Sequence, residues 1–112
     1  MAIAVAKAKA AVAFPAAEVE ACLRDELLEA AAIEAELHGT PWPAEAAAKG
    51  AVSINVDSLV VVEILCAVEP VLGFDLREGL VRAGGYWSVD QAVGHLMPRI
   101  EQAWHKRKGG KS

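Results

Sequence analysis

The most apolar run of the chain is Asp57–Leu65, with the sequence D-S-L-V-V-V-E-I-L, and it decides what the fold can be. It opens on two residue types that favour the first turn of a helix, where backbone N–H groups are unpaired. Asp57 is suited to accept from those amides as the N-cap. Ser58 would carry its hydroxyl at the positive end of the helix dipole, where a phosphate ester would be stabilised. We expect a helix from Ser58 to about Leu72.

A β reading of the same region stays open. The segment Val52–Val56 alternates between apolar and polar residues, and Leu59–Val68 is rich in β-branched residues, so both could be strands of a small α/β fold. Helix is preferred after Asp57 because no tight-turn pair separates the two runs. In addition, Glu63 and Glu69 fall nearly on one side of a helix.

An amphipathic helix with an acidic outer face is expected before this run. Pro15 suits its first position, and Gly39 suits the residue that follows its end. The apolar stripe predicted to face the core repeats at steps of three or four: Val19, Leu23, Leu27, Ala30, Ile33 and Leu37. In the loop that follows, Trp42 lies between two prolines and is expected to pack back on the bundle. Residues 44–49 are expected to add one helical turn.

The C-terminal half predicts two further helices. Residues 77–83 would form a short third helix, broken by Gly84 and the following glycine. Ser88 and Gln91 form a capping box that starts the last helix, with one of the two preceding aromatic residues at its entrance.

Two prolines interrupt the predicted helices. Pro70 cannot bond to the Cys66 carbonyl, so we expect a kink or an early end near Glu69. Pro98 predicts a kink or a restart, which would make residues 99–107 an additional C-terminal helix.

These elements predict an all-α, four-helix bundle with three main helices, a short third one and a possible extra C-terminal helix. The length of 112 residues and 54% hydrophobic content suit one domain with a small core. We expect a flexible extension over residues 1–14, the helical domain over 15–107 and a basic flexible tail over 108–112. The basic run that leads into this tail begins at Lys106.

Composition and spacing argue against several classes of function. The net charge of −4 disfavours nucleic acids as partners, and no apolar stretch is long enough to cross a membrane. Cys22 and Cys66 lack metal-ligand spacing and are expected to be reduced core thiols in a cytoplasmic protein. No metal site is expected, and the chain is expected to be a monomer.

Residues between Asp57 and about Leu96 carry a resemblance to a known family. They are Asp57-Ser58-Leu59, Val62-Glu63, Glu69, Leu72, Leu76, Ser88-Val89, Ala92 and Val93. In this pattern the chain resembles the acyl carrier protein family. The resemblance implies that Ser58, between Asp57 and Leu59, is esterified by 4′-phosphopantetheine. The thiol of that arm would carry acyl, aminoacyl or peptidyl groups as thioesters.

The resemblance also implies partners and a cargo cavity. A phosphopantetheinyl transferase would attach the arm, and loading and processing enzymes would dock on Glu63, Glu69 and Val60. An acyl cavity would be lined by Val62, Cys66, Leu72 and Leu76. Val60 and Pro70 stand where the family usually has acids, which indicates a specialised member. Fatty acid, polyketide, nonribosomal and aminoacyl pathways stay open.

Two other functions compete with the carrier function. An unmodified helical adaptor would bind partners through an exposed patch of Val60, Val61 and Trp104. A serine hydrolase would need a histidine beside Ser58, and no G-x-S-x-G turn surrounds that serine. We therefore expect the chain not to be an enzyme. The histidines available for such a role are His38, His95 and His105.

Overall fold

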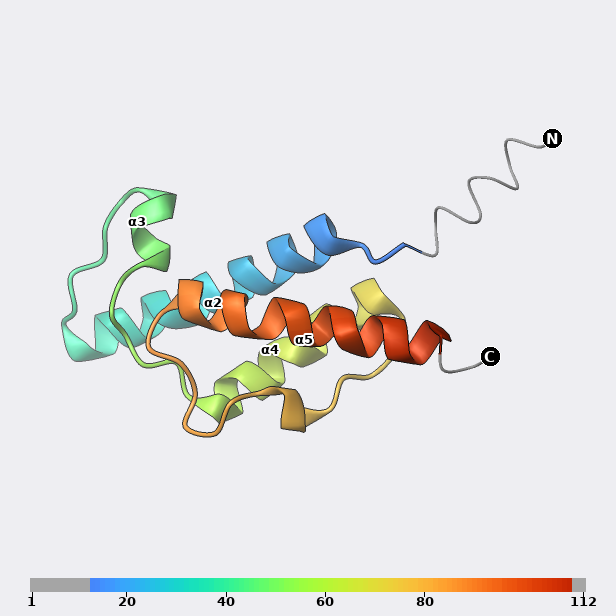
Figure 1. Cartoon of the computed structure of the whole chain (residues 1–112). Helices are drawn as coiled ribbons and strands as arrows, with labels where there is room; N and C mark the ends of the chain where they lie inside the picture. Colours follow the sequence, from blue (N-terminus) through green and yellow to red (C-terminus); the bar gives the residue numbers. More distant parts are fainter. Residues whose placement is uncertain (1–12, 110–112) are drawn as a thin grey trace.

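The computed structural model describes residues 13–109 and is built from three long helices (Figure 1). They are α2 (Ala16–His38), α4 (Ser58–Leu72) and α5 (Val89–Gly109). A short helix, α3 (Ala46–Gly50), lies in the connection between α2 and α4, and one 3-10 turn, η1 (Glu78–Leu80), lies between α4 and α5. The prediction of an all-α small bundle is confirmed, with the expected third helix reduced to that single turn.

Helix α2 packs against both α4 and α5. Its buried residues repeat at a constant step of four: Val19, Leu23, Leu27, Ala31 and Ala35. Four residues turn a helix by about 400°, so this stripe winds around α2 and can face two neighbours in turn. The predicted continuation of the stripe through Ile33 and Leu37 is therefore wrong, whereas Ala30 packs against the edge of the core. Ile33 and Leu37 are exposed, and Ala30 is half-buried.

Helix α4 buries one stripe of its surface and rules out a strand at this place. The buried side chains recur at helical spacing: Val61, Ile64, Leu65, Val68 and Leu72. The helix runs past Pro70 and ends at Gly73, whose φ of 89° is left-handed. The predicted early end near Glu69 is wrong. Because Pro70 lies in the last turn, the one hydrogen bond it removes is not enough to end the helix before it.

The segment before α4 is extended, as its alternating pattern indicated. Ile54 and Val56 are buried while their neighbours are exposed. Val56 forms an isolated antiparallel bridge with Tyr86, with N–O distances of 2.7 and 3.0 Å, and Ile54 N donates to Trp87 O at 2.8 Å. This bridge ties the segment before α4 to the segment before α5.

Helix α5 continues through Pro98 instead of restarting after it. Leu96 and Ile100, on either side of the proline, are both fully buried, and packing of this kind holds the two halves in one helix. The predicted additional C-terminal helix is therefore the second half of α5. The helix also includes residues 108–109, the first two residues of the predicted flexible tail, so the start of that tail is predicted too early.

Several local predictions for the first half of the chain are confirmed. Gly39 adopts φ 68° and completes a Schellman motif in which Thr40 N donates to Ala35 O at 2.8 Å. Trp42 is half-buried against the core, and α3 supplies the extra turn. The position of Pro15 differs by one residue from its prediction, because Pro15 is the N-cap of α2 and Ala16 is the first helical residue. Most of the predicted N-terminal extension and the last residues of the tail lie outside the described residues.

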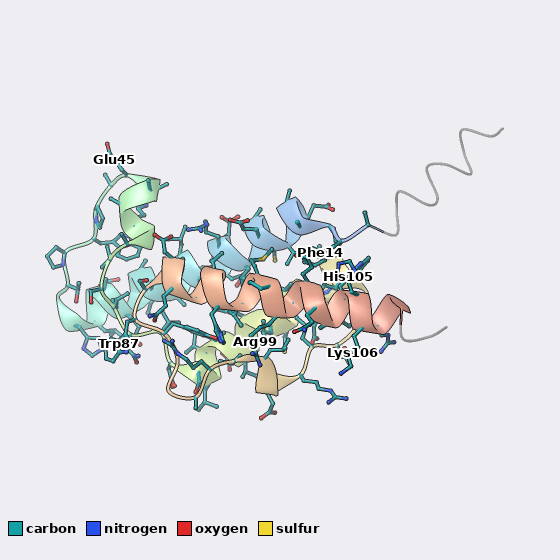
Figure 2. The ribbon with its side chains drawn as sticks, viewed as in Figure 1. Phe14, Glu45, Trp87, Arg99, His105 and Lys106 are labelled. Atoms are coloured by element: carbon teal, nitrogen blue, oxygen red, sulfur yellow. The ribbon has the colours of Figure 1, made fainter. Side chains whose placement is uncertain are left out.

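One end of the bundle is closed by aromatic residues. Trp104, buried in α5, lies 6.0 Å from the ring of Phe14 and 6.3 Å from that of Phe74, measured between centroids. Figure 2 shows Phe14 beside this half of α5. Among residues 13–109, no helix combines the length and the apolar character needed to span a membrane.

Candidate functional site

Ser58 is the first residue of α4, as the sequence predicted. Asp57 precedes it with extended backbone angles, and its Oδ1 accepts from Leu59 N at 3.5 Å, a long capping bond. The side chain of Ser58 is partly exposed, while that of Leu59 is exposed. The predicted attachment residues therefore lie together at the N-terminus of α4, and Ser58 among them is partly exposed.

Some backbone N–H groups at the start of α4 have no hydrogen-bond acceptor. The first intrahelical bond runs from Val61 N to Asp57 O at 3.1 Å. Leu59 N is directed to the Asp57 carboxylate, whereas the amides of Ser58 and Val60 have no acceptor within the described part of the chain. Free amides of this kind favour an anion attached to the first turn.

A glycine loop borders the same helix end. Gly85 is buried with a φ of 82°, and a Cβ built on it would overlap the carbonyl oxygen of Val56 and lie 3.0 Å from Ser58 N. The backbone of Gly85 thus lies in direct contact with the start of α4. Sequence reasoning identified the glycine pair only as a helix breaker and did not place it beside Ser58.

The loop is held by the hydroxyl of Tyr86, the largest fully buried side chain. Arg82 N donates to Tyr86 Oη at 3.0 Å, so the hydroxyl proton is available to donate to His95 Nδ1, which lies 2.7 Å away. Donation by the Tyr86 hydroxyl needs a neutral His95 with its proton on Nε2, and the environment of His95, which lowers its pKa, favours the neutral ring. The Arg82 guanidinium lies over the Tyr86 ring and donates to Gly85 O at 3.2 Å.

The start of α5 is capped as predicted, with one change of partner. Ser88 Oγ accepts from Gln91 N at 3.0 Å, which is half of the expected capping box. Gln91 Oε1 accepts from Trp87 N at 2.8 Å, whereas in a capping box it would accept from the amide of the N-cap residue, Ser88. The same oxygen also accepts from Arg82 Nη2 at 2.8 Å. The cap of α5 is therefore part of the same network as the loop beside Ser58.

This network makes stability depend on the protonation of His95. Burial lowers the pKa of His95, and the charges of Arg99 and Arg82 lower it further. Because the unfolded chain binds the proton more readily, the unfolding free energy should fall as the pH drops through about 6.5 toward the lowered folded pKa. Urea unfolding at several pH values between about 7 and 5 measures this slope.

The matched variant is His95→Asn, whose side-chain oxygen can accept from Tyr86 without titrating. Its slope over the same pH range should be flatter than that of the wild type. Equal slopes in the two proteins would contradict the assigned role of His95.

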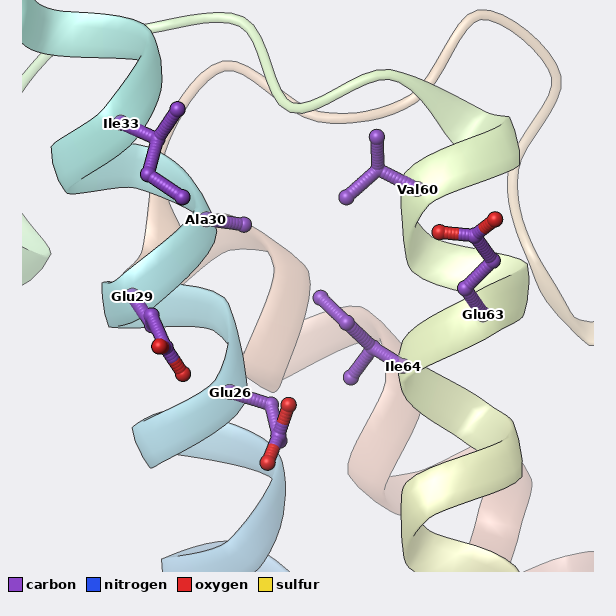
Figure 3. A pocket seen from close by; sticks show the side chains of 7 residues that line it. All are labelled: Glu26, Glu29, Ala30, Ile33, Val60, Glu63 and Ile64. Atoms are coloured by element: carbon purple, nitrogen blue, oxygen red, sulfur yellow. The ribbon is translucent and has the colours of Figure 1, made fainter.

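The predicted docking residues lie in two different settings. Val60 and Glu63 line a shallow groove of ≈ 220 Å³ between α2 and α4, in which Ala30 and Ile33 face Val60 and Ile64 (Figure 3). The groove is also lined by Glu26 and Glu29 from α2. By contrast, Glu69 is half-buried, and its Oε2 accepts from Leu76 N at 2.7 Å, which fixes the loop after α4. The docking role of each residue stays a prediction.

The residues predicted to line an acyl cavity differ in burial. Leu72 is buried, Val62 and Leu76 are half-buried, and Cys66 is exposed. Cys66 lines an open hollow of ≈ 320 Å³ around Pro70 and Phe74. A cavity shared by all of them stays a prediction.

The prediction of two core thiols is wrong for Cys66. That residue falls off the buried stripe of α4, one position after Leu65. Cys22 is half-buried, and its Sγ donates to Ala67 O at 3.6 Å. Burial raises the pKa of the Cys22 thiol, and Glu26 and Asp25 raise it further.

Each histidine has a partner other than Ser58. His95 bonds to Tyr86, His38 Nε2 lies 3.0 Å from Glu34, and the partner of His105 is Glu101 at 3.4 Å. Across residues 13–109, no group of three or more histidine, cysteine or acidic side chains is placed to hold a metal ion. The arrangement at Ser58 therefore consists of a hydroxyl beside two amides without acceptors, and each described histidine is paired with a residue other than Ser58.

Known proteins supply no further guide to this site. No family model matches the chain, and neither a curated protein nor a solved structure shows significant similarity to it. The functional argument therefore depends on the residues and their geometry.

Proposed function

We propose that this chain is a carrier protein that tethers acyl, aminoacyl or peptidyl groups on a 4′-phosphopantetheine arm attached to Ser58. The observation that carries the proposal is the position of Ser58 as the first residue of α4, partly exposed and beside two amides without acceptors. A phosphodiester at this hydroxyl would be stabilised by those amides and by the helix dipole. The resemblance of the D-S-L segment to acyl carrier proteins supports the same assignment.

The attachment chemistry would take place in a phosphopantetheinyl transferase. The Ser58 oxygen would attack the phosphorus that bears the pantetheine group in the pyrophosphate of coenzyme A. A bond from serine to phosphorus forms, the pyrophosphate bond breaks, and adenosine 3′,5′-bisphosphate leaves. The serine proton passes to a base of the transferase. In the carrier, Asp57 would keep the first turn of α4 formed while the ester is made.

Docking of loading and processing enzymes would be weak and partly electrostatic, so that the carrier can be released after each step. Glu63 and Val60 border the groove close to Ser58 and are the proposed docking residues there. Glu69 would contribute through its position at the other end of α4. The arm would keep its cargo at high effective concentration near each enzyme without tight binding.

Mass spectrometry of the intact protein tests the proposal. Incubation with coenzyme A and a broad-specificity phosphopantetheinyl transferase should add the mass of one arm to the wild type and nothing to Ser58→Ala. Ser53→Ala and Ser88→Ala serve as matched controls and should still gain one arm. A wild type that gains no mass with an active transferase would contradict the proposal.

The alternative is an unmodified helical adaptor, and the exposed apolar residues that it would use differ from the predicted ones. Val61 and Trp104 are buried, so the expected patch of Val60, Val61 and Trp104 does not form. Large apolar side chains are instead exposed at Ile33, Leu37 and Leu59. An adaptor would use these residues, and it would remain unmodified in the mass test.

A further inference from the structure

The groove between α2 and α4 has an apolar floor that continues onto exposed surface. Ala30 and Ile33 face Val60 and Ile64 across it (Figure 3). Ile33 is 55% exposed, and Leu37, one helical turn further along the same face of α2, is 72% exposed. Contiguous apolar surface of this kind marks a site of interaction in many proteins.

The rim of the groove is negatively charged. Glu26, Glu29 and Glu63 line it, and within the described residues none of them forms an ion pair or a side-chain hydrogen bond. The basic groups of α2 are engaged elsewhere: Arg24 pairs with Asp90 and Glu20, and His38 pairs with Glu34. Three carboxylates beside an apolar strip repel one another, and a cationic ligand would relieve that repulsion.

We propose that the groove binds an amphipathic helix of a partner protein whose apolar stripe is flanked by lysine or arginine. The apolar stripe would cover Ile33, Leu37 and Val60, and the flanking cations would pair with Glu26, Glu29 and Glu63. The biological role of this binding rests on the proposed carrier function, because the helix would belong to an enzyme that docks beside Ser58. Binding itself requires no arm.

The length of the surface and its charged rim together favour a basic helix over a tethered acyl group. From Glu26 to Leu37 the face of α2 spans eleven residue steps, or about 16 Å at 1.5 Å per residue. A helical partner of about three turns matches that length. A long acyl chain could also cover this strip, but it carries no cation to pair with Glu26, Glu29 and Glu63.

Two synthetic peptides of about four helical turns test the proposal on the protein without its arm. Both carry leucines at helical spacing, and the flanking positions are lysine in one and glutamate in the other. Amide NMR spectra of the labelled protein are recorded during titration with each peptide. The lysine peptide should shift signals of Ile33, Leu37, Val60 and Glu63, and its affinity should fall as salt is raised. The glutamate peptide should not bind.

Charge and apolar variants distinguish binding in this groove from non-specific attraction of a basic peptide to an acidic protein. Glu29→Lys should weaken the lysine peptide about tenfold, and Ile33→Asp should weaken it by a similar factor. Glu45→Lys makes the same change of charge at an exposed position near α3, away from the groove, and should leave affinity unchanged (Figure 2). All of these positions are solvent-accessible, so circular dichroism should show intact helices in each variant.

Three results would overturn the proposal. They are equal affinity of Glu29→Lys and Glu45→Lys, signal shifts that map away from the groove, and no binding of the lysine peptide. Groove signals that move only after an acyl group is loaded on Ser58 would assign the groove to cargo. If the mass test failed but the lysine peptide bound in the groove, the carrier function would be rejected and the proposal of a helix-binding groove would stand.

Discussion

Gly85→Ala is expected to lower the unfolding free energy by about 3 kcal/mol or more, a large part of the about 5–15 kcal/mol typical of a small domain. A Cβ at this position would overlap the Val56 carbonyl oxygen, and alanine disfavours the φ of 82° that Gly85 adopts. Relieving the overlap would separate Val56 from Tyr86 and open the loop beside Ser58. Urea unfolding followed by circular dichroism measures the loss.

Gly84→Ala is the matched control. Gly84 has nearly the same backbone angle, φ 86°, but a Cβ there would meet no atom within 4 Å. The control should therefore lose only the conformational part, about 1 kcal/mol. If both variants lost the same free energy, the contact between Gly85 and the start of α4 would not be important for stability.

Leu27→Ala is expected to cost about 3 kcal/mol, because Leu27 is fully buried at the middle of α2 and its removal leaves a cavity. Leu37→Ala removes the same atoms from the same helix at a position that is 72% exposed, so it should change the unfolding free energy by less than about 0.5 kcal/mol. Chemical unfolding of both variants measures the difference.

This pair also decides which stripe of α2 faces the core. A large loss for Leu37→Ala would support the stripe predicted from spacing alone and would contradict the buried stripe at steps of four. It would also remove the exposed surface on which the proposed partner groove depends.

Local signals predicted the parts of the fold that are decided within a few residues. The start of α4 after Asp57 and the Ser88–Gln91 cap are set by side chains that bond to the nearby backbone. The left-handed Gly39 is set by its lack of a Cβ and by backbone bonds within the same turn. The place of Ser58 could be predicted for the same reason, because a helix start depends on its own cap.

Features that depend on contacts distant in sequence could not be predicted in the same way. The bridge between Val56 and Tyr86 joins segments thirty residues apart, so the position of Gly85 beside Ser58 has no local signal. The rotation of the buried stripe of α2 depends on its having two neighbours, which the spacing of apolar residues does not reveal. Pro98 would end an isolated helix, but burial on both sides keeps α5 continuous.

The candidate site likewise combines features that could be predicted from local sequence with features that depend on tertiary packing. The position of Ser58 at the start of α4 follows from local chemistry, whereas the network of Tyr86, His95 and Arg82 beside it follows from tertiary packing. The groove between α2 and α4 has one local signal, the acidic face of α2. Its apolar floor emerges only when Ile33 lies opposite Val60.

Fragment mass spectrometry of the transferase-treated protein tests the central claim most directly. The chain has four serines, at positions 53, 58, 88 and 112, and fragmentation can assign an added group to one of them. The account predicts that the wild type gains a single phosphopantetheine group and that every fragment bearing it contains Ser58. An arm on another serine, or none at all with an active transferase, would contradict it.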